Sequence, residues 1–196
     1  AFASLADSIA SSTLDEFDTF EASASGKTTK FGNVKVHVPS GWTGTKTSDK
    51  VVHVYNNYNN YAFVNCKAVK ISSKQTLYSV ARESYNSTST ATDWAYNSQY
   101  GNYSYKMVND SGQTVYCFFF DHKTLPKQVA SGYVLGIAIS SEAYDYSVRD
   151  DILNSIKVTG KSKSNDDDSS SCGGNIFGLG AINIMMLGVL LLHKKR

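Results

Sequence analysis

Hydrophobic and polar residues alternate most clearly over residues 33–38. The side chains of Val34, Val36 and Val38 should point to one side of the chain, and those of Lys35 and His37 to the other. This period of two predicts a β-strand with one buried face and one solvent-facing face. We therefore expect the folded domain to contain a sheet that packs one side of this segment against a core.

Further segments with strand-like patterns follow at short intervals. They are residues 51–55, 61–71, 100–108, 113–120 and 133–140, which are rich in Val, Ile, Tyr and Phe. The Asn/Tyr-rich run at 56–60 predicts a turn between the first two of these strands. Asn109 to Gly112 predicts the turn of a hairpin between the next two.

Two segments have helical periodicity and helix-start signals. Ser72 has the capping-box spacing to Gln75, and the helix that follows would bury Leu77, Val80 and Ala81. A second helix would begin after Ser147, with Asp150 three residues on, and would bury Val148, Ile152 and Ile156. Residues 86–96 are polar and read as a loop. The order of elements predicts an α+β domain over residues 31–158, in which an antiparallel sheet is flanked by helices.

The segments on either side of this domain are polar. Residues 1–30 are acidic, and their apolar residues have loosely helical spacing, so a docked helix and a disordered extension both fit. Gly26 to Lys30 reads as a break before the domain. Residues 159–175 have nothing to bury and predict a flexible linker.

The C-terminal segment differs from the rest of the chain. Residues 176–192 are uncharged and mostly apolar, and the chain then ends in His193-Lys194-Lys195-Arg196. This pattern predicts a transmembrane helix in the lipid bilayer, with its basic end on the cytoplasmic side and the N-terminal domain outside the cell membrane. Ala1-Phe2-Ala3 has the form of a signal-peptide cleavage region, which also indicates a secreted chain.

Charge and cysteine content narrow the choice of partners. The chain of 196 residues carries 19 basic and 17 acidic residues, a net charge of +2, and no basic run of the kind that binds phosphate backbones. We therefore expect no nucleic acid partner. Cys66 and Cys117 lie in predicted strands, where they could either form a disulfide or remain as two buried thiols. Cys172 lies in the predicted linker and is the third cysteine, which a disulfide between the other two would leave over.

Three motifs within the domain resemble the PsbP-like fold. They are Val38 to Trp42 (V-P-S-G-W), Tyr133 to Ile137 (Y-V-L-G-I) and Asp151 to Val158 (D-I-L-N-S-I-K-V), together with the Tyr-rich hairpin between them. The resemblance implies an antiparallel sheet between helices, as in photosystem extrinsic subunits and in many bacterial lipoproteins and surface proteins. That fold serves diverse functions and implies little about activity.

A second resemblance concerns the tail. Cys172-Gly173-Gly174, followed by an apolar segment and a basic terminus, is similar to the bacterial tripartite C-terminal sorting signals of the GlyGly-CTERM kind. This resemblance implies a membrane sorting protease as a partner, which cuts near the motif so that the protein is released or re-anchored. A permanent anchor is the alternative.

Sequence motifs for catalysis are absent. The histidines have no zinc-ligand spacing, and no nucleophile elbow or P-loop occurs. Cys117 and His122 would suit a nucleophile and base, but Cys117 alternates with apolar residues and reads as part of a packed strand face. We therefore expect neither a cofactor nor enzymatic activity.

The tyrosines offer the best candidate binding surface. They include Tyr55, Tyr58 and Tyr61 around the first turn, and Tyr100, Tyr103 and Tyr105 on the hairpin. Tyr gives flat apolar area with a hydrogen-bonding tip, as surfaces that bind glycans or proteins need, although strands also favour Tyr for packing. We expect a membrane-anchored surface module that binds or supports the cell envelope. A tethered hydrolase and an assembly factor for a membrane complex are the rival hypotheses.

Overall fold

The computed structural model describes residues 20–23 and 26–160. The chain divides into two units, Ala1–Gly160 and Lys161–Arg196. Residues 161–175, which make up most of the predicted linker, the predicted membrane segment 176–192 and the motif Cys172-Gly173-Gly174 lie outside the described residues, as do residues 1–19. All described residues belong to the first unit.

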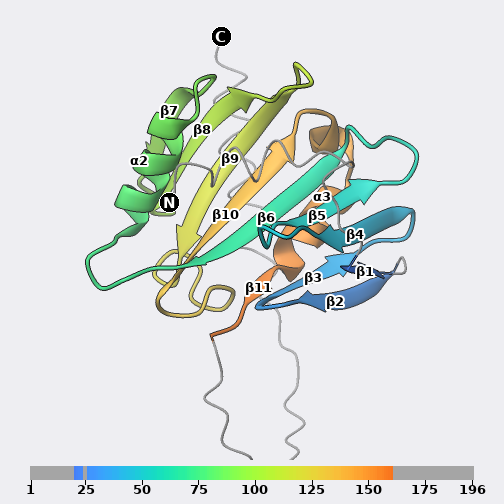
Figure 1. The fold of residues 1–196 in the computed structure, drawn as a ribbon, viewed down its shortest axis with the longest axis horizontal. Coiled ribbons are helices and arrows are strands. Elements are labelled where there is room, and N and C mark those ends of the chain that lie inside the picture. The colour runs from blue at the N-terminus through green and yellow to red at the C-terminus, as the bar shows by residue number, and fades with distance from the viewer. Residues whose placement is uncertain (1–19, 24–25, 161–196) are drawn as a thin grey trace, which may run out of the picture. The chain divides into compact units, whose positions relative to one another are not determined.

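An eight-stranded sheet forms the centre of this unit, and all pairs of neighbouring strands within it are antiparallel (Figure 1). In spatial order the strands are β1 (Phe20–Ser23), β4 (Trp42–Lys46), β5 (Val52–Asn56), β6 (Phe63–Lys70), β10 (Tyr133–Ser140), β9 (Thr114–Asp121), β8 (Asn102–Val108) and β7 (Thr92–Asn97). A smaller sheet contains β11 (Lys157–Val158), β3 (Val34–Val38) and β2 (Lys27–Phe31). A parallel bridge joins Val129 to Val158. The predicted antiparallel α+β class is confirmed.

The middle of the large sheet is its most apolar strand. All eight residues of β10 are buried, and the strand pairs with β6 on one side and β9 on the other. A strand that is covered on both faces needs a continuous apolar run, which Tyr133 to Ile139 supplies. The predicted strand 133–140 is therefore confirmed with both of its ends.

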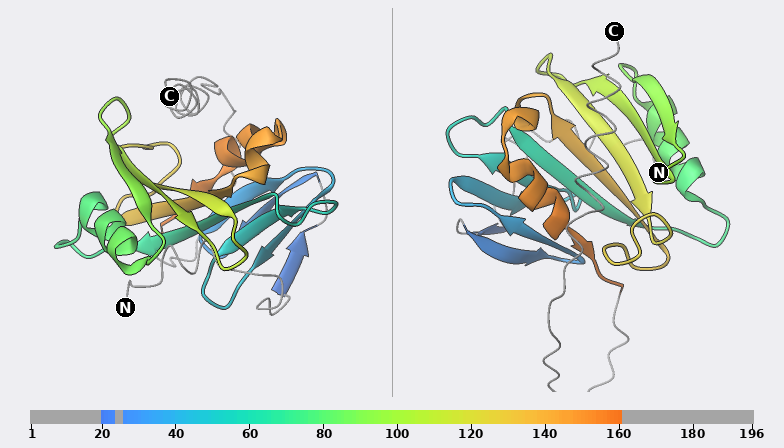
Figure 2. Two further views of the ribbon diagram at one scale, coloured as in Figure 1. Left: turned by 90° about the horizontal axis from the view of Figure 1, so that it is seen from above. Right: turned by 180° about the vertical axis from the view of Figure 1, so that it is seen from behind.

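Two α-helices of the described residues lie on opposite sides of the large sheet (Figure 2). The helix α2 (Leu77–Ser87) contacts β8 and β9. Its buried residues Leu77, Val80 and Ala81 join a core cluster with side chains from these strands, among them Tyr105 and Phe119. The predicted buried stripe of this helix is confirmed.

The helix α2 begins later than the capping signal at Ser72 predicts. Its N-cap is Thr76, whose Oγ1 accepts a hydrogen bond from the Ser79 N–H, while the Ser79 hydroxyl accepts one from the Thr76 N–H. Ser72 and Gln75 instead close a turn before the helix, in which Gln75 Oε1 accepts a hydrogen bond from the Ser72 N–H. At Ser72 the Gln75 N–H donates to the Ser72 backbone carbonyl and not to the Ser72 side chain, so only Thr76, which lies next to the first buried residue Leu77, forms a reciprocal capping box.

The second helix, α3 (Val148–Ser155), contacts β3 and follows the 3-10 helix η2 (Glu142–Asp145). Ile152 is buried within the helix and Ile156 directly after it, as predicted, but Val148 is only half-buried. Arg149 is buried instead, and its Nε donates to Asp150 at 3.1 Å. Ser147 stands at the N-cap without a side-chain hydrogen bond.

Two polar segments of the sequence form strands that the pattern did not predict. Within the expected loop 86–96, Thr92 begins the edge strand β7. The expected break at Gly26 to Lys30 is largely β2, and Phe20 to Ser23 forms β1. All three strands lie at sheet edges, and most side chains of β2 and β7 contact water, so these two strands carry no apolar alternation of the kind that marks β3.

No helix within residues 20–23 and 26–160 is long and apolar enough to cross a membrane. The predicted membrane segment falls outside that part of the chain and stays a prediction.

Candidate functional site

Aromatic side chains from α2, β7 and β8 meet at one end of the large sheet. The ring centroid of Tyr103, on β8, lies 5.5 Å from that of Tyr78 on α2, 5.4 Å from Trp94 and 4.8 Å from Tyr96, both on β7. The rings of Trp94 and Tyr103 are stacked with an interplanar angle of 24°. We refer to Tyr78, Trp94, Tyr96 and Tyr103 as the aromatic platform.

The hairpin of β7 and β8 sets the positions of three platform residues. Tyr96 and Tyr103 are directly opposite in the strand register, so their side chains lie on the same face. Trp94 precedes Tyr96 by two residues and shares that face. The register shifts between Thr92 and Ala95, where Asp93 has a φ of 54°. This irregularity bends the edge strand locally.

The helix supplies the fourth ring and supports the platform from below. Tyr78, Arg82 and Tyr85 are spaced by four and three residues, which puts them on one helix face. The Arg82 guanidinium carbon lies 5.0 Å from the Trp94 centroid and 5.1 Å from that of Tyr85. Such a cation–π contact holds an aromatic ring in place while the charge stays near water.

The platform is continuous with the core. Tyr85 contacts Trp94 at 5.3 Å and Tyr105 at 5.5 Å, and Tyr105 stacks on Phe119 at 5.8 Å. The Tyr105 hydroxyl and the Ser84 hydroxyl are hydrogen-bonded at 3.0 Å. Because its lower side rests on packed residues, the platform is preorganised and would lose little conformational entropy on binding a ligand.

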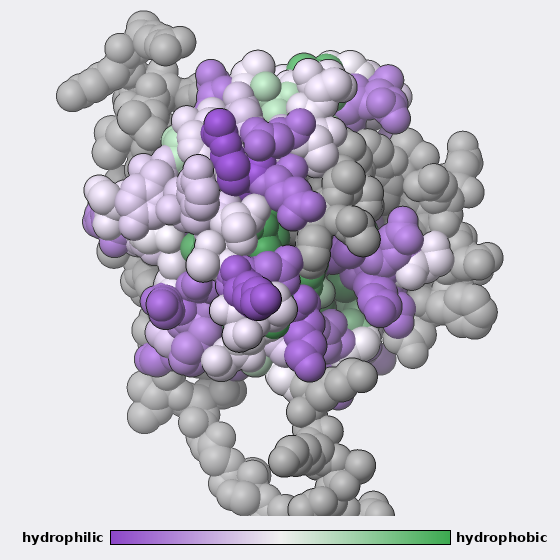
Figure 3. Space-filling view, turned by 60° about the vertical axis from the view of Figure 1, so that its left-hand side comes forward, coloured by the Kyte–Doolittle hydropathy of each residue, from purple (hydrophilic) through white to green (hydrophobic). Residues whose placement is uncertain are grey.

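The upper side of the platform is open to solvent. Tyr78 is 51% exposed and Tyr96 55% exposed, whereas Trp94 and Tyr103 are half-buried. Figure 3 brings the side of the molecule with α2 and β7 forward, and much of that surface is pale or purple, with only small hydrophobic areas. A surface of this kind suits a ligand that presents both flat apolar faces and hydroxyl groups.

The phenol of Tyr103 stays protonated at physiological pH. Partial desolvation, followed by the neighbouring Tyr96 and Tyr78, raises the pKa of Tyr103 above its ordinary value. A neutral phenol both donates and accepts a hydrogen bond. The centre of the platform therefore has a polar group that can hold a ligand hydroxyl in either role.

The other two tyrosines predicted on this hairpin contribute differently. Tyr105 is only 2% exposed and belongs to the core beneath the platform. Burial, more than any other influence, raises the pKa of its phenol. Tyr100 is half-buried in the β7–β8 turn, where its N–H donates to Asn97 Oδ1 at 3.3 Å. Of Tyr100, Tyr103 and Tyr105, only Tyr103 belongs to the platform.

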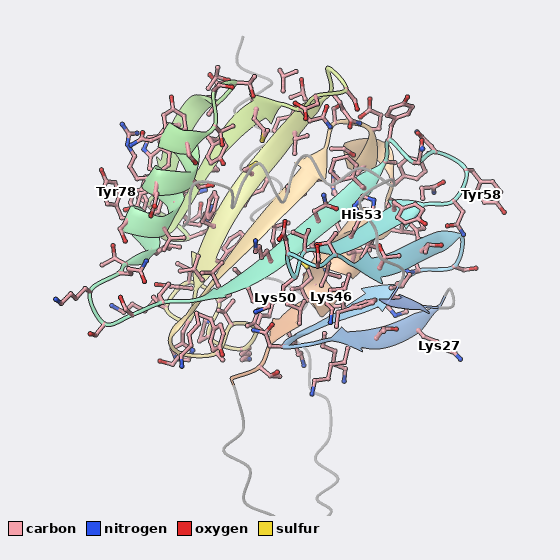
Figure 4. All side chains as sticks on the ribbon, in the orientation of Figure 1. Lys27, Lys46, Lys50, His53, Tyr58 and Tyr78 are labelled. Atoms are coloured by element: carbon pink, nitrogen blue, oxygen red, sulfur yellow. The ribbon has the colours of Figure 1, made fainter. Side chains whose placement is uncertain are left out.

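The tyrosines around the first turn lie elsewhere. Tyr58 is 91% exposed and Tyr61 58% exposed, both in the loop between β5 and β6. Figure 4 places Tyr58 at the opposite end of the large sheet from Tyr78. Tyr55 is half-buried, and its ring lies 4.9 Å from that of His53. The six predicted tyrosines therefore do not form one surface.

The structure does not bring Cys117 and His122 together. Cys117 is buried in the core cluster beneath α2, whereas His122 follows the end of β9 and its Nδ1 lies 3.0 Å from the Val129 carbonyl oxygen. At about 3.4 Å per residue, the four positions from Cys117 to Asp121 span roughly 13 Å of strand. Among the described residues, no three His, Cys, Asp or Glu side chains cluster as metal ligands would.

Of the two alternatives open for Cys66 and Cys117, the structure does not show the disulfide. Cys66 is opposite Ile137, and Ile137 is opposite Phe118, so these three side chains share one face of the sheet. Cys117 precedes Phe118 and points to the other face, with β10 between the two cysteines. Both residues are buried as thiols, and burial raises the pKa of Cys66 to about 12. The alternative of two buried thiols is the one that the structure supports.

Tyr78, Trp94 and Arg82 were not predicted as site residues. The spacing of Tyr78, Arg82 and Tyr85 on a helix indicates a shared face, but nothing in the sequence shows which strand lies beside it. Trp94 falls in the segment that reads as a loop. The platform therefore depends on the packing of α2 beside the β7–β8 hairpin, which only the three-dimensional structure shows.

The fold and this surface define a mostly antiparallel α+β protein with an exposed aromatic site. No family model matches the chain, and no curated protein does. The solution structure of cyanobacterial PsbP (CyanoP) from Synechocystis sp. PCC 6803 is similar, with a TM-score of 0.42 and 12% sequence identity, over 78% of this chain and 99% of that chain. Its name is that of the family which the sequence motifs resemble. A similarity at this level of identity carries neither a function nor a site over to this chain.

Proposed function

We propose that this protein is a non-catalytic binding module that is displayed on the outer side of a membrane and holds a glycan of the cell envelope. The observation that carries this proposal is the aromatic platform, in which Tyr103 contacts three further aromatic rings at centroid distances of 4.8 to 5.5 Å. Sugar rings combine apolar faces with hydroxyl groups, so they match a surface of stacked Tyr and Trp rings with phenol groups at their edges.

The membrane placement comes from the sequence of the tail. The apolar segment 176–192, followed by the basic terminus Lys194 to Arg196, supports a single membrane span with the binding domain outside. Cys172-Gly173-Gly174 supports processing of this tail by a sorting protease. In this proposal the PsbP-like resemblance concerns the fold, and the platform provides the function.

Substitution of an exposed platform residue should weaken glycan binding. Tyr96→Ala removes a ring that is 55% exposed and contacts Tyr103, and we expect the Kd for a bound envelope oligosaccharide to rise at least about tenfold, which corresponds to about 1.4 kcal/mol. Binding is measured by titration calorimetry across a panel of soluble glycans and envelope fragments. Because Tyr96 lies on an edge strand, the folded state should persist in the variant.

Tyr61→Ala is the matched control. Tyr61 is 58% exposed and also lies next to a turn, but it is outside the platform. Its substitution should leave the Kd unchanged. Equal losses in the two variants, or no binding of any glycan by the unmodified protein, would count against the platform as a glycan site.

A further inference from the structure

The outer face of the small sheet carries a row of three lysines. Lys30 on β2 is directly opposite Lys35 on β3, and Lys35 is directly opposite Lys157 on β11. All three residues are exposed. We call Lys30, Lys35 and Lys157 the lysine ladder.

The ladder has no partner of opposite charge among the described residues. The ion pairs found there are Lys106 with Asp93 and Arg149 with Asp150, neither of which involves a ladder lysine. Directly opposite residues of neighbouring strands have Cβ atoms about 5 Å apart, and like charges in such positions destabilise a sheet. The ladder therefore concentrates positive charge at a cost to the fold, which an external anionic partner would offset.

The arrangement of the ladder suits an extended anionic surface. Its strands hold three ammonium groups in one row on the face of a sheet, and His37 extends the same face two residues beyond Lys35. The opposite sides of β2 and β3 carry Phe31, Val34 and Val36, which are buried in the core. The small sheet is thus rigidly backed, and its cationic face is free of the apolar residues that would insert into a protein partner.

We propose that the lysine ladder rests on the anionic phosphate headgroups of the bilayer. The choice of a bilayer rests on the membrane placement proposed above. Lys157 is 19 residues before Ile176, where the predicted span begins. A fully extended chain of that length covers at most roughly 65 Å, so in this proposal the ladder remains within that distance of the membrane surface. Each lysine near such a surface contributes roughly a fivefold gain in binding.

The test measures lysine reactivity in the full-length chain. The protein is mixed with vesicles of zwitterionic lipid, or with vesicles that also contain phosphatidylglycerol, and acetylation of each lysine is followed by mass spectrometry. We expect Lys30, Lys35 and Lys157 to react severalfold more slowly with the anionic vesicles, and Lys74, exposed in the turn before α2, to serve as the unaffected reference. Raising the ionic strength should abolish the protection, because salt screens exposed charges.

Lys35→Glu provides the decisive variant. It changes two charges at the centre of the ladder, so binding to the anionic vesicles should fall about 25-fold at low salt and Lys30 and Lys157 should lose their protection. The same change turns two like-charge pairs into two opposite-charge pairs, and the thermal midpoint should rise by about 1 to 5 °C. Lys74→Glu makes the same change in net charge and should alter neither quantity much.

Three outcomes would overturn the proposal. The first is equal lysine reactivity with both kinds of vesicle. The second is protection by soluble dextran sulfate but not by vesicles, which would assign the ladder to a free polyanion. The third is a lower thermal midpoint for Lys35→Glu. Flotation with zwitterionic vesicles measures membrane insertion of the tail separately. A failure of the anchor can therefore be distinguished from a failure of the lysine ladder.

Discussion

At the scale of single residues, the pair His53 and Asn65 shows how the sheet accommodates polar groups inside its core. The two residues are opposite one another on β5 and β6, both are buried, and His53 Nδ1 is hydrogen-bonded to Asn65 Oδ1. The rings of Tyr55 and Phe63 lie 4.9 and 5.5 Å from the imidazole ring. Burial in these surroundings lowers the pKa of His53 to about 4, and the Asn65 hydrogen bond offsets this in part.

This pair makes the stability of the protein depend on pH. The unfolded chain takes up a proton on His53 below about pH 6.5, whereas the folded chain does so only near pH 4, so stability is lost as the pH falls between these values. At pH 4.5 the loss from this residue should be about 2 to 3 kcal/mol. Urea unfolding at pH 7 and pH 4.5 measures it.

His53→Gln is the control for this prediction. Glutamine can still donate a hydrogen bond to Asn65 but does not titrate in this range. The difference in unfolding free energy between the two proteins should therefore shrink or reverse at pH 4.5. An identical pH dependence in both proteins would show that folding does not lower the pKa of His53.

At the scale of elements, the strands with regular alternation or continuous apolar runs were predictable, and the start of α2 was not. Val34 to Val38 and Tyr133 to Ser140 were located from pattern alone. Ser72 and Thr76 both precede polar residues at capping-box spacing, so the sequence offers two helix starts four residues apart. Packing decides between them, because the helix must begin where Leu77 can reach the core.

The choice of cap can be tested by two alanine substitutions. Thr76→Ala removes the acceptor for the Ser79 N–H and should lower the free energy of unfolding by about 1 kcal/mol. Ser72→Ala affects an exposed turn and should cost less than about 0.5 kcal/mol. Urea denaturation of both variants gives the comparison. A larger loss for Ser72→Ala would place the helix start at the earlier site.

The aromatic platform was predictable only in part, because packing also decides which aromatic rings meet. Tyr103 was a candidate because Tyr is frequent on the β8 segment, but its neighbours come from a helix and from the edge strand β7. Trp94 and Tyr96 alternate over too few residues to indicate a strand, and the irregularity at Asp93 interrupts the period just before them. The lysine ladder was equally hidden, because Lys30, Lys35 and Lys157 come together only through strand register.

At the scale of the whole described unit, the two sheets meet at a position without a side chain. A Cβ atom added to Gly44 on β4 would lie 2.7 Å from Val38 Cγ2 and 3.2 Å from the Phe31 ring. Gly44 is thus the site of close approach between the large sheet and the strands β2 and β3. Nothing in the sequence around Trp42 to Lys46 indicates this contact, since it joins residues of two different sheets.

Gly44→Ala should therefore destabilise the fold by about 1 to 3 kcal/mol, because the added methyl group forces the two sheets apart. Thermal or urea unfolding measures the change. Gly160→Ala adds the same group where its nearest neighbour, the Ala130 Cβ, is at 3.8 Å, and it should be nearly neutral. Equal stability of both variants would mean that the sheets yield at Gly44 without strain.

The irregularity of the edge strand β7 affects whether two molecules of this protein can pair through that strand. An exposed and regular edge strand can pair with the same strand of another molecule. At high protein concentration, repeated pairing of this kind would produce fibrous aggregates. Asp93 has a positive φ that interrupts the regular backbone geometry of β7, and its carboxylate forms an ion pair with Lys106 at 2.7 Å. A bend and a charge at this position discourage the addition of a strand from another molecule, so the aromatic platform beside β7 stays accessible at high protein concentration.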